Sequence, residues 1–172
     1  MARQALGFNL RHVNRRIAAA LLLFGTVSSC ERAEPSLGVG GAHVVLPAIP
    51  GRPGTAYFVI DADAFGDEPL PHIRQVRVEG VGRAEMHQSM TTHGMARMRP
   101  LATVPIAKGM TRFCPGGLHV MLFDLDERLT PGAQTRIHVA LSNGRHLDPD
   151  ARVVALGDTV HAEAPYDCGA PG

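Results

Sequence analysis

Lysine and aromatic side chains are scarce in this chain. Tryptophan is absent, aromatic residues make up 5% of the 172 residues, and lysine occurs once, as Lys108. Nucleic-acid binding needs a basic stripe or patch, whereas the 17 basic residues here are balanced by 16 acidic ones. These shortages exclude nucleic acid as an expected partner.

Catalytic motifs and long apolar runs are lacking as well. The sequence has no HExxH pair, no glycine-rich phosphate loop, no paired-carboxylate motif and no Ser-His-Asp set. We therefore expect a protein that is not an enzyme. The apolar stretch 17–27 has 11 residues, which is too short to cross a hydrocarbon core that needs about 20.

The N-terminus has the pattern of an export signal. Four arginines and no acidic residue precede or flank the apolar stretch 17–27, as in a secretory signal. The stretch ends in residues 27–30 (VSSC), which resemble a bacterial lipobox. We therefore expect residues 1–29 to be a lipoprotein signal peptide and Cys30 to be lipidated, an ordinary signal peptide being the alternative. Residues 30–41, polar and rich in glycine, are expected to form a flexible tether.

Export and lipidation together predict a protein anchored by lipid to the membrane, on the periplasmic side of the cell envelope. Removal of the signal leaves 13 basic against 16 acidic residues, a formal charge of −3. Cys114 and Cys168 are then the two cysteines that carry no lipid. Because an oxidising compartment favours disulfides, a bridge between these two is one alternative and two free thiols the other.

The remainder of the chain lacks helical periodicity. Short runs of β-branched and apolar residues are separated by Gly and Pro about every 8–12 residues, which predicts an all-β sandwich or barrel. We expect this domain to span 42–157 and a C-terminal tail to span 158–172. The segment 61–71 is expected to be a loop. The strands are expected at 43–46, 56–60, 73–79, 83–88, 96–101, 110–113, 118–123, 135–141 and 152–156.

Methionine is concentrated in one window of the sequence. Apart from Met1, all methionines fall between positions 86 and 121, together with His87, His93 and His119. Thioether sulfur is a soft ligand and imidazole an intermediate one, so this combination favours Cu(I) over Zn(II), Mg(II) or Ca(II). His119 and Met121 are two residues apart on an expected strand and therefore share a face. The alternative is that the methionines fill a core.

The order of these residues carries a family resemblance. Ten residues separate His87 from Met98, and twenty separate Met98 from His119, which is followed by Met121. Together with residues 54–58 (GTAYF), 97–100 (RMRP) and 115–122 (PGGLHVML), this spacing resembles the PCu(A)C family of periplasmic copper chaperones. The resemblance extends from about position 42 to 156.

Membership of that family would imply a cupredoxin-like Greek-key β-sandwich that binds copper(I). By position, the resemblance assigns the ligands to His87, Met98, His119 and Met121. It also implies that the protein carries Cu(I) and hands it to a cuproprotein, such as the binuclear copper centre of cytochrome c oxidase, or to another copper chaperone.

Further residues could support such a site. Glu85 alternates with His87 along an expected strand and could orient its imidazole. Met90, His93 and Met95 could act as auxiliary ligands or shield the metal, although plain loop or packing roles are the alternative.

Two other functions fit parts of the sequence. A blue-copper electron-transfer site needs two histidines, a cysteine thiolate and a weak methionine ligand, and Cys114 could supply the thiolate. A metal-free lipoprotein that acts as an interaction module of the envelope is the third alternative, against which the clustering of methionine argues.

Overall fold

The computed structural model describes residues 38–92, 95–158 and 168, all within the compact unit Ala33–Gly172. The predicted signal peptide (1–29), Cys30, His93 and most of the predicted C-terminal tail lie outside the described residues. Within these ranges no helix is long and apolar enough to cross a membrane.

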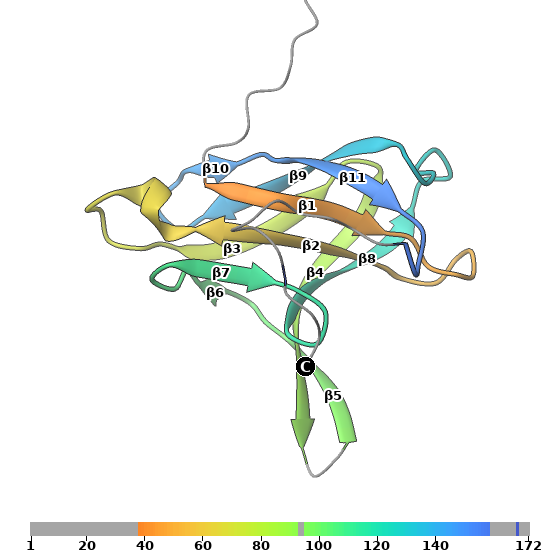
Figure 1. The fold of residues 1–172 in the computed structure, drawn as a ribbon, viewed down its shortest axis with the longest axis horizontal. Helices are drawn as coiled ribbons and strands as arrows, with labels where there is room; N and C mark the ends of the chain where they lie inside the picture. Colours follow the sequence, from red (N-terminus) through yellow and green to blue (C-terminus); the bar gives the residue numbers. More distant parts are fainter. Residues whose placement is uncertain (1–37, 93–94, 159–167, 169–172) are drawn as a thin grey trace, which may run out of the picture. The chain divides into compact units, whose positions relative to one another are not determined.

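Strands and one short 3-10 helix make up the described chain (Figure 1). In chain order the elements are β1 (Val39–Val45), β2 (Gly54–Asp61), the 3-10 helix η1 (Ala62–Phe65), β3 (His72–Val78), β4 (Val81–Thr92), β5 (Met95–Pro100), β6 (Val104–Pro105), β7 (Met110–Phe113), β8 (Leu118–Leu125), β9 (Gln134–Leu141), β10 (His146–Leu147) and β11 (Asp150–Val154).

The strands form one continuous hydrogen-bonded sheet that folds back on itself. Its order is β5-β4-β8-β7-β2-β1-β11-β9-β3-β6, with β10 added to β9 and a further pairing between β8 and β2. Strand pairs β1–β11 and β7–β8 are parallel, and the others are antiparallel. In Figure 1, β3 and β9 lie behind β1 and β2, so the sheet forms two layers. The all-β sandwich predicted from the sequence is confirmed.

Each strand predicted from the sequence is present, and most differ only at their ends. The prediction for 110–113 coincides with β7, whereas β4 runs to Thr92, four residues beyond the predicted end. The two-residue strands β6 and β10 were not predicted, because two residues show no periodicity. The segment 61–71, predicted as a loop, contains η1.

The core lies between the two layers and is built by alternation along the strands. On β2, Ala56, Phe58 and Ile60 are fully buried, and the Phe58 ring stacks on Phe113 at a centroid distance of 4.4 Å. Strand β8 contributes Val120 and Leu122, both fully buried, in the same way. Because side chains alternate between faces, residues between these buried positions face away from the core. The buried core residues of the second layer include Ile73, Val76, Val78, Ile137, Val139, Leu141, Ala151 and Val153.

The β4–β5 hairpin extends beyond the sandwich. Strand β8 pairs with β4 only as far as Gln88, whereas β5 pairs with β4 from His87 to Thr92. The outer half of the hairpin is therefore a two-stranded ribbon with β5 as an edge strand, and Figure 1 shows it projecting from the body of the fold.

A disulfide joins the end of β7 to the C-terminal segment. Cys114, which follows β7, is bonded to Cys168 with a Cα–Cα distance of 5.6 Å. Of the two alternatives that the sequence left open for these cysteines, the structure contains the bridge.

Candidate metal centre

Two histidines face each other across the β4–β8 pair. His87 on β4 is directly opposite His119 on β8, and their ring centroids are 5.9 Å apart. Their neighbours Met86 and Val120 also form a pair, and these two side chains are buried in the core. The alternation along both strands therefore places the two imidazoles together on the outer face of the sheet.

Two methionines join the histidines on this face. Met121 lies two residues after His119, opposite Glu85. Met98 on β5 is opposite Ser89, two residues after His87. Directly opposed residues share a face, and diagonal neighbours two residues apart remain within reach of long side chains. The register thus gathers the donors His87, Met98, His119 and Met121 on three adjacent strands, with His87 on the middle strand.

The imidazole of His119 is held by the turn before β8. Its Nδ1 donates to the carbonyl oxygen of Gly117 at 3.0 Å, which leaves Nε2 as the atom able to bind a metal. The same carbonyl accepts the backbone N–H of Ser89 at 2.9 Å, so the turn is also fixed to β4. His119 is 5% exposed and is the more deeply buried of the two histidines.

The imidazole of His87 is oriented through Nε2, whereas that of His119 is oriented through Nδ1. Its Nε2 lies 3.2 Å from a carboxylate oxygen of Glu85, and its buried Nδ1 has no hydrogen-bond partner among the described residues. The hydrogen bond with His87, together with the charge of nearby Arg83, holds the pKa of Glu85 below its usual range. Glu85 is therefore ionised at neutral pH, as required of a carboxylate that accepts a hydrogen bond from the N–H of a metal-binding imidazole.

Arg83 completes this row of contacts and was not singled out in the sequence. Its guanidinium donates to Glu85 and lies 3.9 Å from the centroid of the Phe123 ring, its partner on β8. The signal that could have found it is the spacing of two residues, because Arg83, Glu85 and His87 share one face of β4.

The donor set fits a soft, singly charged metal ion. Two neutral imidazole nitrogens and two thioether sulfurs suit Cu(I), whereas harder divalent ions prefer oxygen ligands. Among the residues described, no group of three or more His, Cys, Asp or Glu is placed to hold a metal. Buried polar atoms are normally paired. The buried Nδ1 of His87, which has no partner among the described residues, is therefore the atom that most strongly indicates a metal site here.

The residues considered as auxiliary ligands do not join this set. Met90 is opposite Arg97 and Met95 is opposite Thr92, so both methionines belong to the face of the hairpin that is opposite to Met98. The expectation of an auxiliary role overlooked this alternation, and His93 lies outside the described residues. Glu85, in contrast, is placed where the sequence predicted it.

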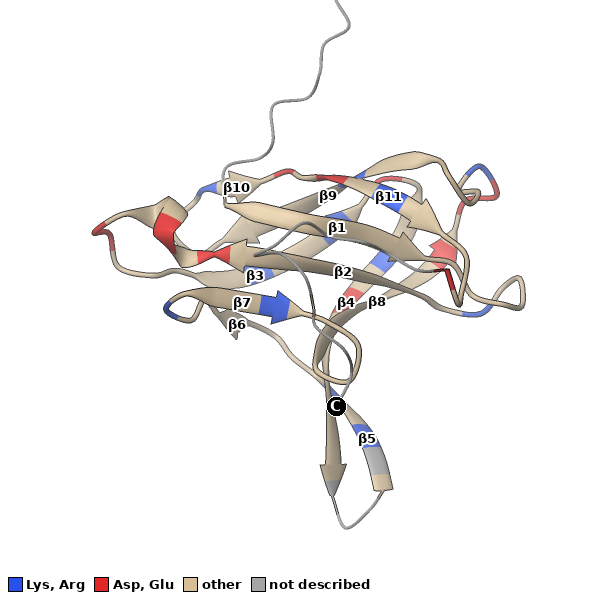
Figure 2. Cartoon of the chain, viewed as in Figure 1, with Lys and Arg blue, Asp and Glu red and all other residues tan. Residues whose placement is uncertain are grey.

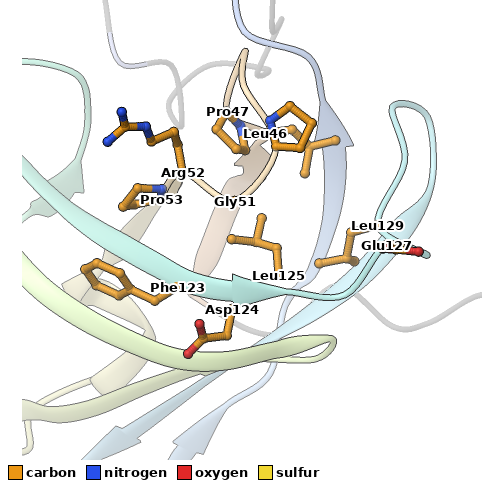
Figure 3. A pocket seen from close by; sticks show the side chains of 11 residues that line it. Leu46, Pro47, Gly51, Arg52, Pro53, Phe123, Asp124, Leu125, Glu127 and Leu129 are labelled. Atoms are coloured by element: carbon orange, nitrogen blue, oxygen red, sulfur yellow. The ribbon is translucent and has the colours of Figure 1, made fainter.

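A cavity of about 630 Å³ lies at the other end of β8 and is separate from the donors (Figure 3). Its walls include Leu46 from the loop after β1, and Leu125 and Leu129 from the end of β8 and beyond. No histidine, methionine or cysteine lines it, so it contributes nothing to the metal centre.

Comparisons with known proteins agree with this architecture. The profile of the LpqE-like lipoprotein family matches residues 37–153. No curated protein matches the sequence. Among solved structures, the copper-bound PCuAC domain of PmoF2 superposes with a TM-score of 0.53 at 14% identity, covering 68% of this chain and 91% of the domain.

Two further structures share the fold. The apo PCuAC domain of PmoF1 has a TM-score of 0.51 and 21% identity, covering 68% of this chain and 92% of the domain. The solution structure of the Cu(I) form of DR1885 from Deinococcus radiodurans has a TM-score of 0.51 and 26% identity, covering 73% of this chain and 83% of DR1885. The cupredoxin-like fold of PCuAC domains, expected from the sequence resemblance, is confirmed.

Proposed function

Because the chain belongs to the LpqE-like lipoprotein family and has the fold of PCuAC domains, we propose that it is an extracytoplasmic Cu(I) chaperone. The observation that carries the proposal is the donor set itself. His87, Met98, His119 and Met121 lie on one outer face, and the buried Nδ1 of His87 has no partner in the part of the chain that the structure describes. Copper is the cargo of this protein, and the proposal includes no catalytic step.

The chemistry of the donors explains why the ion would be Cu(I). No carboxylate or thiolate belongs to the set, so the bound ion keeps its single positive charge. Such a site binds a soft monovalent ion and disfavours Zn(II), Mg(II) and Ca(II). A recipient that offers thiolates would neutralise the charge and withdraw the metal, which is the behaviour required of a carrier.

The exposure of the donors supports the same proposal. His119 is 5% exposed, whereas Met98 on the edge strand is 61% exposed. An incoming ligand would therefore replace Met98 first and His119 last. The recipient would be a cuproprotein, for which the binuclear copper centre of cytochrome c oxidase is one candidate, or another copper chaperone.

Membership of a lipoprotein family supports the lipid anchor predicted at Cys30. With that anchor the domain would be held at the membrane on the periplasmic side, and the tether would let it move between a copper source and a recipient.

The blue-copper alternative loses its thiolate in this structure. Cys114 is bonded to Cys168 and therefore has no thiolate to offer. Intense blue colour on addition of Cu(II) would nevertheless favour electron transfer over the carrier function.

Anaerobic competition for Cu(I) with a chromophoric chelator tests the proposal. We expect the wild-type protein to bind one Cu(I) per chain. Loss of a residue that only hydrogen-bonds to a metal ligand lowers affinity by about 10- to 100-fold. His119→Ala removes a proposed ligand itself and should lower the Cu(I) affinity by more than that. His146→Ala, which removes an exposed histidine of β10, should leave the affinity unchanged. No competition by the wild-type protein would favour a metal-free interaction module.

A further inference from the structure

Exposed methionines gather on the β4–β5 hairpin. Five large hydrophobic side chains are exposed in the described part of the chain, and three of them are Met90, Met95 and Met98, with exposures of 37%, 56% and 61%. Met98 lies on one face of the ribbon, and Met90 and Met95 lie on the other. The ribbon thus presents apolar, polarisable surface on both faces, although packing within the chain does not require it.

The outer half of this hairpin, from position 88 to 100, carries positive charge and no negative charge. Arg97 and Arg99 precede and follow Met98 on β5, both are exposed, and no acidic residue occurs between positions 88 and 100. In Figure 2, β5 is marked blue for basic residues, whereas the red of acidic residues falls on the body of the fold. This local charge contrasts with the formal charge of −3 expected for the chain without its signal peptide.

We propose that this hairpin surface, made of Met90, Met95, Arg97, Met98 and Arg99, docks an acidic protein surface that presents the thiolates receiving copper. The inference rests on the proposed function and adds to it the place of transfer and the charge of the partner. Methionine and arginine are both enriched in protein–protein interfaces, and complementary charge speeds encounter and selects partners.

The recipient must approach at the edge of the ribbon, because Met98 and the two arginines all lie on the edge strand β5, with Arg97 and Arg99 on the face opposite to Met98. Met98 is on the edge strand and is the most exposed of the proposed donors, whereas His119 is covered. During transfer copper remains Cu(I), its bonds to the methionines and imidazoles break, and two Cu–S bonds form to the recipient. The two thiol protons pass to solvent. A bound Cu(I) and two arginines together attract an anionic recipient.

Arginines on an edge strand also have a simpler role, which is to prevent edge-to-edge pairing with other chains. Charge reversal to glutamate separates the two roles, because glutamate still opposes pairing but repels an acidic partner. Arg97→Glu/Arg99→Glu therefore tests the sign of the charge and leaves the edge protected. Neither arginine supplies a metal donor, so the variant should still bind one Cu(I) per chain.

The experiment measures Cu(I) transfer by stopped flow from the full-length chain to two synthetic dithiol peptides. The peptides share the same two cysteines and differ in flanking glutamates or lysines. For the wild-type protein at low ionic strength we expect transfer to the acidic peptide to be about tenfold faster than to the basic one. High salt should remove the difference. In Arg97→Glu/Arg99→Glu the preference should reverse.

A matched control and a membrane assay complete the design. Arg52→Glu/Arg152→Glu makes the same change of charge at exposed positions outside the hairpin and should keep the wild-type preference. Equal rates for the two peptides, or equal effects of the two double variants, would overturn the inference. A second result would also overturn it. If Arg97→Glu/Arg99→Glu abolished binding to phosphatidylglycerol vesicles and left copper transfer to the peptides unchanged, the hairpin surface would bind the membrane and not an acidic protein. A wild-type chain that binds no Cu(I) would refute the proposed function itself.

Discussion

The contact between Glu85 and His87 yields a quantitative prediction. Loss of a carboxylate that orients a metal-binding imidazole typically lowers metal affinity 10- to 100-fold. In this chain the Nε2–Oε2 distance is 3.2 Å and the Glu85 side chain is 40% exposed, so the bond is long and partly screened by water. We therefore expect Glu85→Ala to weaken Cu(I) binding by about tenfold, at the lower end of that range. Glu85→Gln retains an acceptor oxygen without charge and should lose less, about threefold.

Chelator competition measures these affinities, and thermal unfolding without metal should show equal stability for the wild type and both variants. The chain offers a matched control in Glu79, whose carboxylate lies 3.3 Å from Nε2 of His138, away from the donors. Glu79→Ala breaks the same kind of contact and should leave the Cu(I) affinity unchanged. An unchanged affinity in Glu85→Ala, or an equal loss in Glu79→Ala, would refute the orienting role of Glu85.

Three further predictions concern other parts of the molecule. Met121→Leu should lower the unfolding free energy by less than about 1.5 kcal/mol and should weaken Cu(I) binding. Met86→Leu makes the same exchange in the core and should leave chelator competition unchanged. Loss of folding in Met121→Leu would identify Met121 as a core residue. Burial lowers the pKa of His43 below 6.5, so the folded state binds its proton less readily than the unfolded state. Stability is then complete above about pH 6.5 and falls as the pH decreases below it, and the fall in melting temperature between pH 7 and 5 should be smaller in His43→Gln. The bond between Cys114 and Cys168 spans 54 residues, so Cys168→Ser should lower the unfolding free energy by about 4 kcal/mol in a denaturant titration, and an unchanged midpoint would contradict this estimate.

The fold could be predicted because alternation and turn residues mark most of its strands. Phe58 lies in an apolar run and Phe113 ends the short alternating strand MTRF, and both are fully buried. The extension of β4 to Thr92 could not be predicted in the same way. Its outer half buries nothing and is held by pairing with β5, so its sequence carries no apolar alternation.

Spacing along one strand predicts which candidate donors share a face, but it does not predict their partners on neighbouring strands. His119 and Met121 share a face because they are two residues apart on one strand, whereas the partnership of His87 with His119 depends on the register between β4 and β8. The register between β4 and β5 places Met90 on the face opposite to Met98, which nearness in the sequence had concealed. The role of the Gly117 carbonyl could not be predicted, because every residue carries a backbone carbonyl and a sequence motif does not show which one accepts a hydrogen bond.

The proposed donors belong to strands that differ in how firmly they are packed into the sheet. On β8, His119 and Met121 alternate with the fully buried Val120 and Leu122, so the core that stabilises the sandwich also fixes these two donors. Met98 belongs to β5, an edge strand whose Met95, Arg97, Arg99 and Pro100 are exposed as well. Motions that open a site draw on regions with few buried contacts. The edge strand can therefore move without disturbing the core, and exchange of ligands should begin at Met98 while His119 still holds the ion.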